Sequence, residues 1–179
     1  MPRFSSEEIR EIFSGSRDFN DLLDAFQDAL LQGLQDLSLY RMLFWNPALT
    51  PDEVCLFGEK LAKENPGLAF ETFVWLAKVF ETTFSSYDNF ELAMKYYRKA
   101  AHAKADDPLP YLGAADCFDP NINLPPPFAL IQFLKEGLVQ VVDKREILDR
   151  IAYLFEMIGD TEQSEHYRKL SDDLRRSKN

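Results

Sequence analysis

The chain has 179 residues, of which 46% are hydrophobic and 15 are phenylalanine, which is enough apolar material to form one core of ordinary domain size. Its formal net charge of −10 argues against nucleic acid and against an anionic membrane surface as partners, because both are bound by clustered Lys and Arg. Neither a signal-peptide pattern nor an apolar run of about 18 residues occurs, so we expect a cytoplasmic protein that is not inserted in a membrane.

The sequence predicts helices throughout. Only seven glycines interrupt it, and no alternating strand pattern bounded by Asn-Gly or Asp-Gly turns is present. Ser5 or Ser6 is expected to cap a first helix and Asp18 a second. Thr50, followed by Pro51 and Glu53, is a strong start signal for a helix that should end at residues 65–67.

Residues 39–47 are rich in aromatic and aliphatic side chains and are too apolar to stay open in a monomer. They are expected either to pack on the first repeat or to form an interface. We favour packing, and keep dimerisation through this N-terminal third as the alternative.

The rest of the chain predicts further helices separated by short breaks. They are expected over 68–86, 90–105, 109–118 and 128–141, then from a capping box at 143–146 to a turn at Gly159-Asp160, and last over 161–174. Three consecutive prolines, Pro125 to Pro127, cannot lie inside a helix, so the segment before Phe128 is predicted to be an extended loop. This loop is interpreted as a stiff linker or, alternatively, as a functional insertion that binds a partner or the protein's own groove.

Phenylalanine recurs at Phe84, Phe118 and Phe155, separated by 34 and then 37 positions, each time near the end of a predicted helix. A period near 34 is the signature of stacked helical hairpins. Together with the small and aromatic residues Ala93, Tyr97 and Ala100 on the following helix, the pattern resembles the tetratricopeptide repeat family.

The resemblance covers residues 74–178, with units that start at Val74, Pro108 and Arg145. It implies an all-α fold, a right-handed solenoid of about three tetratricopeptide-like helical hairpins. We therefore predict an N-terminal helical segment at residues 1–66, which is either a divergent first repeat or a dimerisation region, and one continuous repeat domain at residues 67–179.

Within that family the chain is similar to class II chaperones of type III secretion, which hold translocator proteins before export. The likeness rests on the acidic charge, the length and the run Ala114-Ala115-Asp116-Cys117-Phe118. It implies a cytoplasmic chaperone for secreted client proteins.

The family pattern also implies a peptide-binding groove lined by the first helix of each hairpin. Carried over by position, its residues are Trp75, Lys78, Thr82, Ser85, Leu109, Leu112, Asp116, Asp119, Asp149, Tyr153, Glu156 and Met157. Such a groove suits an extended client peptide whose apolar side chains enter pockets while its backbone or basic groups meet the carboxylates. Trp75 and Tyr153 are the expected aromatic anchors, and the alternative is that they and Met157 are core residues.

Catalytic and metal-binding motifs are lacking in the sequence. His102 and His166 each stand alone, and no nucleophile elbow, phosphate loop or metalloprotease motif occurs. We therefore expect no enzyme, no cofactor and no metal, and a protein or peptide as the partner. The leading hypothesis is a peptide-binding chaperone or adaptor. The alternatives are a structural adaptor subunit of a larger assembly and, third, a helical enzyme.

Overall fold

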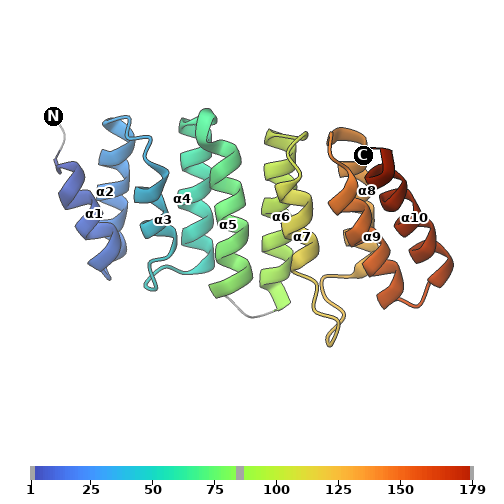
Figure 1. Cartoon of the computed structure of the whole chain (residues 1–179). Helices are drawn as coiled ribbons and strands as arrows, with labels where there is room; N and C mark the ends of the chain where they lie inside the picture. Colours follow the sequence, from blue (N-terminus) through green and yellow to red (C-terminus); the bar gives the residue numbers. More distant parts are fainter. Residues whose placement is uncertain (1–2, 84–86, 178–179) are drawn as a thin grey trace. The chain divides into compact units, whose positions relative to one another are not determined.

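The computed structural model describes residues 3–83 and 87–177, and these residues are predominantly helical (Figure 1). One isolated bridge, between Asp119 and Leu124, is the extended pairing found in this part of the chain. The α-helices are α1 (Ser6–Gly15), α2 (Phe19–Leu31), α3 (Leu37–Phe44), α4 (Pro51–Glu64), α5 (Ala69–Thr83), α6 (Tyr87–Ala103), α7 (Leu109–Asp116), α8 (Pro127–Gln140), α9 (Arg145–Met157) and α10 (Thr161–Ser177), and a short 3-10 helix, η1 (Pro66–Leu68), precedes α5.

Local sequence signals explain several of the helix starts. Ser5 caps α1 and Thr50 caps α4, and each is joined by a glutamate three residues later in a reciprocal capping box. Asp18 caps α2 by accepting a hydrogen bond from the Asn20 amide at 2.7 Å. These three predictions are confirmed, and so is Pro51 at the first position of its helix.

Two local predictions differ from the structure. The box expected at residues 143–146 does not form, because Lys144 is the N-cap of α9 and makes no side-chain capping bond. Asp143 instead accepts a hydrogen bond from the Arg145 amide at 3.3 Å, which is a turn rather than a cap. The break expected at 87–89, between the predicted helices over 68–86 and 90–105, is the first turn of α6. The predicted end at Ser86 of the preceding helix, and Phe84 of the repeated phenylalanines, lie outside the described residues.

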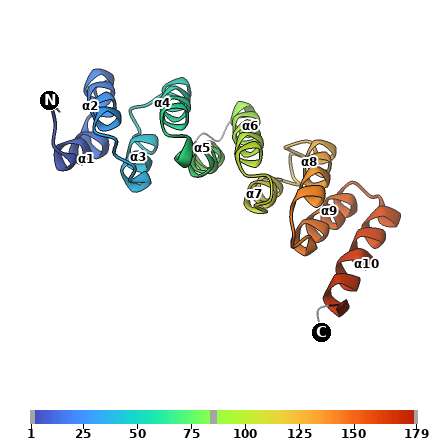
Figure 2. The ribbon, with the colours of Figure 1, turned by 90° about the horizontal axis from the view of Figure 1, so that it is seen from above.

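The chain divides into two compact units, Met1–Ser85 and Ser86–Asn179. In the first unit the odd-numbered helices α1, α3 and α5 form one row and α2 and α4 form the other (Figure 2). Residues 19–66, within the predicted N-terminal segment, therefore form helices that alternate between these rows. The predicted division at residues 66 and 67 falls within this unit and stays a prediction.

Aromatic rings fill the core of the first unit. Phe26 of α2 meets Phe57 of α4 edge-on, with ring centroids 4.8 Å apart, and Tyr40 of α3 at 6.0 Å. Phe13 of α1 extends the cluster to Tyr40 at 6.4 Å, and all four side chains are buried. About half of the apolar segment 39–47 packs into this core, through Leu39, Tyr40, Leu43 and Phe44. Packing was the interpretation favoured over an interface.

The second unit is built by close approach of helices at glycine. A methyl group added at Gly113 of α7 would lie 2.6 Å from the Tyr97 ring of α6. One added at Gly137 of α8 would lie 2.8 Å from the base of the Tyr111 ring of α7. Each glycine therefore lets a buried tyrosine lie directly on the backbone of the next helix.

The remaining helices of this unit extend the same arrangement. α7 and α9 pack together in one row, α8 packs on both, and α10 packs along α9 (Figure 2). Antiparallel helix pairs of this length in two rows are the tetratricopeptide-like hairpins predicted from the sequence. The predicted fold class, all-α and made of such hairpins, is confirmed for the helices within each unit.

The proline-rich segment forms a short closed loop between α7 and α8. The Asp119 amide donates to the Leu124 carbonyl at 2.7 Å, and the Leu124 amide donates back at 3.3 Å. Pro125 and Pro127 are buried, and Pro127 begins α8 at the position where a proline is tolerated. The segment is thus a loop, as predicted, but residues 119–124 fold back on themselves instead of running extended.

Candidate functional site

The predicted groove residues fall into two groups, one in each unit. Trp75, Lys78 and Thr82 lie on α5 of the first unit, and Ser85 lies outside the described residues. The second unit carries the other eight, on α7, on α9 and in the loop between α7 and α8. Most residues of each group lie on odd-numbered helices, α5 in the first unit and α7 and α9 in the second.

Trp75 stands at the centre of a cluster on α3 and α5. The guanidinium carbon of Arg41 lies 4.1 Å above its ring, a stacking distance for a cation on an aromatic face. Trp45 meets the same ring edge-on, with centroids 6.3 Å apart. Trp75 is half-buried, whereas Trp45 is 41% exposed. Trp75 is thus neither wholly core nor a free anchor, and these three side chains form what we call the Trp75 cluster.

The Trp75 cluster contains a cation without an acidic partner. No carboxylate of the described residues forms an ion pair with Arg41, whereas Arg10 on α1 pairs with Asp36 at 3.3 Å. The indole nitrogen of Trp75 is buried and has no hydrogen-bond partner among the described residues. The cluster therefore offers an aromatic surface and the unpaired charge of a guanidinium side by side.

Lys78 and Thr82 follow Trp75 along α5, and both are exposed. The Thr82 hydroxyl donates to the Lys78 carbonyl at 2.7 Å, so its hydrogen is already used within its own helix. Of the two, Lys78 is better placed to offer a free polar group to a ligand.

In the second unit, Asp116 and Tyr153 come together across α7 and α9. They line a small pocket of about 260 Å³ with Ala115, Phe118 and Arg150. Arg150 forms an ion pair with Asp116 at 2.8 Å, and Phe118 meets Tyr153 edge-on at 6.5 Å. Tyr153 is 40% exposed, which leaves one side of its ring open to a ligand. We call this the Asp116 pocket.

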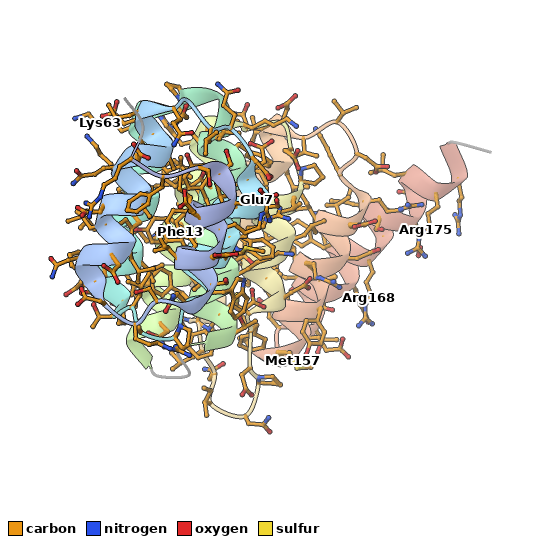
Figure 3. All side chains as sticks on the ribbon, turned by 90° about the vertical axis from the view of Figure 1, so that its left-hand side faces the viewer. Glu7, Phe13, Lys63, Met157, Arg168 and Arg175 are labelled. Carbon is orange, nitrogen blue, oxygen red and sulfur yellow. The ribbon has the colours of Figure 1, made fainter. Side chains whose placement is uncertain are left out.

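Two further carboxylates that were predicted to line the groove form ion pairs with arginines of α10. Arg175 pairs with Asp149 at 3.2 Å, and Arg168 pairs with Glu156. Figure 3 labels both arginines. These pairs are exposed, so each is screened by water and weak. A basic ligand would nevertheless have to displace an arginine at three of the four carboxylates that the sequence assigned to the groove.

Asp119, the fourth carboxylate, serves the proline loop. Its side chain accepts hydrogen bonds from the Asn121 amide at 2.8 Å and from the Asn121 side chain at 2.9 Å. This is the local turn geometry that aspartate favours. Its hydrogen bonds therefore hold the loop, and none of them joins it to the Asp116 pocket.

The predicted apolar groove residues remain partly open to solvent. Leu109 at the start of α7 is 40% exposed and Met157 at the end of α9 is 43% exposed, while Leu112 is half-buried. Side chains of this kind add contact area for a ligand without specifying its chemistry.

Sequence reasoning missed four participants: Arg41, Trp45, Phe118 and Arg150. Trp45 was visible within the aromatic segment 39–47, and Phe118 was visible as a repeated phenylalanine. Arg41 and Arg150 carried no local signal, because their roles depend on which neighbouring helix each side chain meets.

Neither a metal site nor a membrane-spanning helix is found among the described residues. Within 3–83 and 87–177 no group of three or more His, Cys, Asp or Glu is placed to hold a metal ion. His102 is exposed, and so is His166, which lies edge-on to Tyr167. None of the described helices combines the length and apolar character needed to cross a membrane.

A solved structure is similar to this chain, whereas no protein-family model and no curated protein matches the sequence. Among solved structures, the chain is similar to a thermophilic TPR protein from Thermus thermophilus. The two are 14% identical, with a TM-score of 0.49, and the match covers 93% of this chain and 90% of the other. The assignment of helical hairpins therefore rests on the helix packing within each unit described above.

Proposed function

We propose that the chain is a protein-interaction module without catalytic activity, and that its odd-numbered helices bind an extended segment of a client protein. The observation that carries this proposal is the Trp75 cluster. Two tryptophans, one of them 41% exposed, lie beside a guanidinium that has no acidic partner among the described residues. Trp and Arg are the residue types that most often dominate the energetics of protein interfaces.

The Asp116 pocket is the proposed second contact. Its volume of about 260 Å³ and the open side of Tyr153 suit one apolar side chain of a client. Its ion pair gives the wall of this pocket both signs of charge, so it does not select strongly for an acidic or a basic residue. We therefore assign the discrimination between clients to the Trp75 cluster.

The test begins with a client recovered from native cells by a tag on this chain and identified by mass spectrometry. The purified client is then titrated into the wild type and into a variant carrying Trp75→Ala and Tyr153→Ala. We expect the variant to lose at least about tenfold in affinity, because two aromatic anchors are removed. Leu31→Ala is the matched control, since Leu31 is 85% exposed on α2 and lies on neither site. Equal affinity of the double variant and the control would refute binding on these helices.

The alternative function is that of a structural subunit held permanently in a larger assembly. It predicts that the chain alone aggregates or unfolds, whereas an adaptor or chaperone is soluble and folded by itself. The cooperativity of thermal unfolding of the isolated chain separates the two.

The narrower hypothesis is a cytoplasmic chaperone of type III secretion, and it rests on the run from Ala114 to Phe118. In the structure Ala114, Ala115 and Cys117 of this run are buried, so helix packing accounts for them without a shared client. A translocator-like secreted protein among the recovered clients would support this hypothesis. Homodimerisation through the N-terminal third is tested by light scattering on dilution, and a monomer at all concentrations would remove it.

A further inference from the structure

A furrow runs between α6 and α8 in the second unit, on the row opposite α7 and α9. Figure 2 shows α6 and α8 in this same row. Two pockets lie along it, of about 470 Å³ and about 500 Å³, and Arg98 of α6 lines both of them. Each volume is within the range of pockets that hold ligands. We call the two pockets together the α6–α8 furrow.

The walls of the furrow are largely apolar. Phe90 and Met94 of α6 face Pro125 of the loop in the first pocket. Tyr111 and Val139 line the second. The Tyr111 hydroxyl donates to the Ala105 carbonyl at 3.1 Å, so its hydrogen is already used within the unit. Val139 is 77% exposed, so this wall is open to a partner.

The charges along the furrow are ordered. Arg98 lies at the junction of the pockets, with its guanidinium carbon 5.9 Å from the Phe133 ring centroid. Glu91 lines the first pocket and Glu136 the second. In the described part of the chain none of these three side chains forms an ion pair. The furrow thus presents an acidic group, a basic group and an acidic group in succession, each without an opposite charge.

The spacing of these charges fits an extended peptide. Glu91 and Arg98 are two helical turns apart, which is about 10 Å along α6. An extended chain covers that distance in about three residues. We propose that the α6–α8 furrow binds an extended segment of a partner protein that has an acidic residue at its centre, apolar residues on both sides and basic residues toward its ends. This surface is distinct from the odd-numbered helices proposed to bind the client.

The test is selection of a library of random peptides displayed on phage against the immobilised full chain. We expect the wild type to enrich peptides with a carboxylate between apolar residues. Arg98→Glu should lose them, and a selected peptide labelled with a fluorophore should bind this variant at least about tenfold more weakly than the wild type. Arg176→Glu makes the same charge change on α10, away from the furrow, and should leave the affinity within about twofold of wild type.

A second pair of variants tests the furrow without changing Arg98. Val139→Asp places a negative charge on the open wall, whereas Val142→Asp does so at a residue that is 93% exposed and lines neither pocket. Only the first should weaken the selected peptide. Thermal unfolding checks that all four variants are folded. The double variant Trp75→Ala with Tyr153→Ala should bind this peptide like the wild type, so failure of this site and of the client site can be told apart.

Three results would overturn the proposal. One is the absence of enriched peptides with a central acidic residue. Another is an enriched set that is the same for the wild type and Arg98→Glu. The third is a concentration-dependent dimer that Val139→Asp abolishes and Val142→Asp does not, which would make a second copy of the chain the occupant of the furrow.

Discussion

The helices within the first unit and those within the second pack through different contacts. In the first unit, rings pack on rings, as Phe26 does with Phe57 and Tyr40. The second unit has ring pairs too, such as Tyr111 with Phe133 at 4.8 Å, but there rings also pack on backbone, as Tyr97 does at Gly113 and Tyr111 at Gly137. A ring cluster can absorb a change by shifting several side chains, whereas a ring that lies on a glycine has nowhere to move.

The surfaces of the odd-numbered helices differ as well. The first unit presents Arg41 stacked on Trp75, without an acidic partner among the described residues. The second presents Asp116, Asp149 and Glu156, each already paired with an arginine. Charge is therefore available to a ligand on the first surface and largely balanced on the second.

The largest effect is expected in the ring cluster. Phe26→Ala should lower the free energy of unfolding by about 4 kcal/mol, because it removes a buried ring and leaves a cavity. Urea denaturation measures it, with Phe128→Ala as the control because that ring is 70% exposed. A loss below about 1 kcal/mol would show that neighbouring rings collapse into the space, and the contrast in packing would then be even greater.

A smaller loss is expected where a ring lies on a glycine. Gly137→Ala should destabilise the chain by about 2 kcal/mol, because the new methyl group meets the base of the Tyr111 ring, which cannot swing away. Gly58→Ala in the first unit should cost less, although its methyl group would lie 2.3 Å from Cδ1 and 2.9 Å from Cγ of Leu76, because a leucine side chain can change rotamer whereas the base of the Tyr111 ring cannot move away. Gly67→Ala meets open space and is the control. Equal losses at Gly137 and Gly58 would remove the distinction between the units.

Alkaline pH should affect the tyrosine of the ring cluster. Burial raises the pKa of Tyr40 from 10.0 to about 12. The unfolded chain therefore releases this proton first, and the resulting stability is present below pH 10 and lost as pH rises toward 12. Tyr40→Phe should cost about 1 kcal/mol at neutral pH by leaving the Leu34 carbonyl without its 2.8 Å hydrogen bond.

The same variant should flatten the fall in stability above pH 10, as measured by urea unfolding at a series of pH values. Burial also raises the pKa of Tyr111 in the second unit, and Glu136 adds to this shift. Tyr111→Phe should therefore act in the same direction. An unchanged alkaline slope in Tyr40→Phe would contradict the burial of this hydroxyl.

The smallest effect is expected at the ion pairs of the second unit. Asp116→Asn should change the free energy of unfolding by less than about 0.5 kcal/mol, since both partners are exposed. Asp149→Asn should behave alike, because its pair with Arg175 is exposed too. A loss above about 1 kcal/mol, insensitive to salt, would mean that these pairs hold the second unit together.

Much of the helix layout was predictable because its signals are local. Ser5, Asp18 and Thr50 act on amides two or three residues away, so they can be recognised in the sequence itself. Ala93, Tyr97 and Ala100 are buried, as the repeat pattern requires. The capping box at residues 143–146 was wrong because the same residue types also satisfy a simple turn.

The candidate site was predictable only in part. Trp75 and Tyr153 could be found from their register, but the partners that modify them come from other helices. Arg41 reaches Trp75 from α3, and Arg168 and Arg175 reach α9 from α10. Such contacts depend on how one helix is rotated against another, which the spacing of residues along the chain does not record.

The two tyrosine contacts at glycine have a consequence for α7 itself. This helix receives the Tyr97 ring at Gly113 and inserts its own Tyr111 ring at Gly137 of α8. Rotation of α7 about its axis would push one of these rings into the backbone of the neighbouring helix. The two contacts therefore fix the rotation of α7 about its own axis. Leu109, Leu112 and Asp116 are thereby held at fixed angles before any partner arrives. A ligand that contacts them would lose little free energy in ordering the surface that it binds.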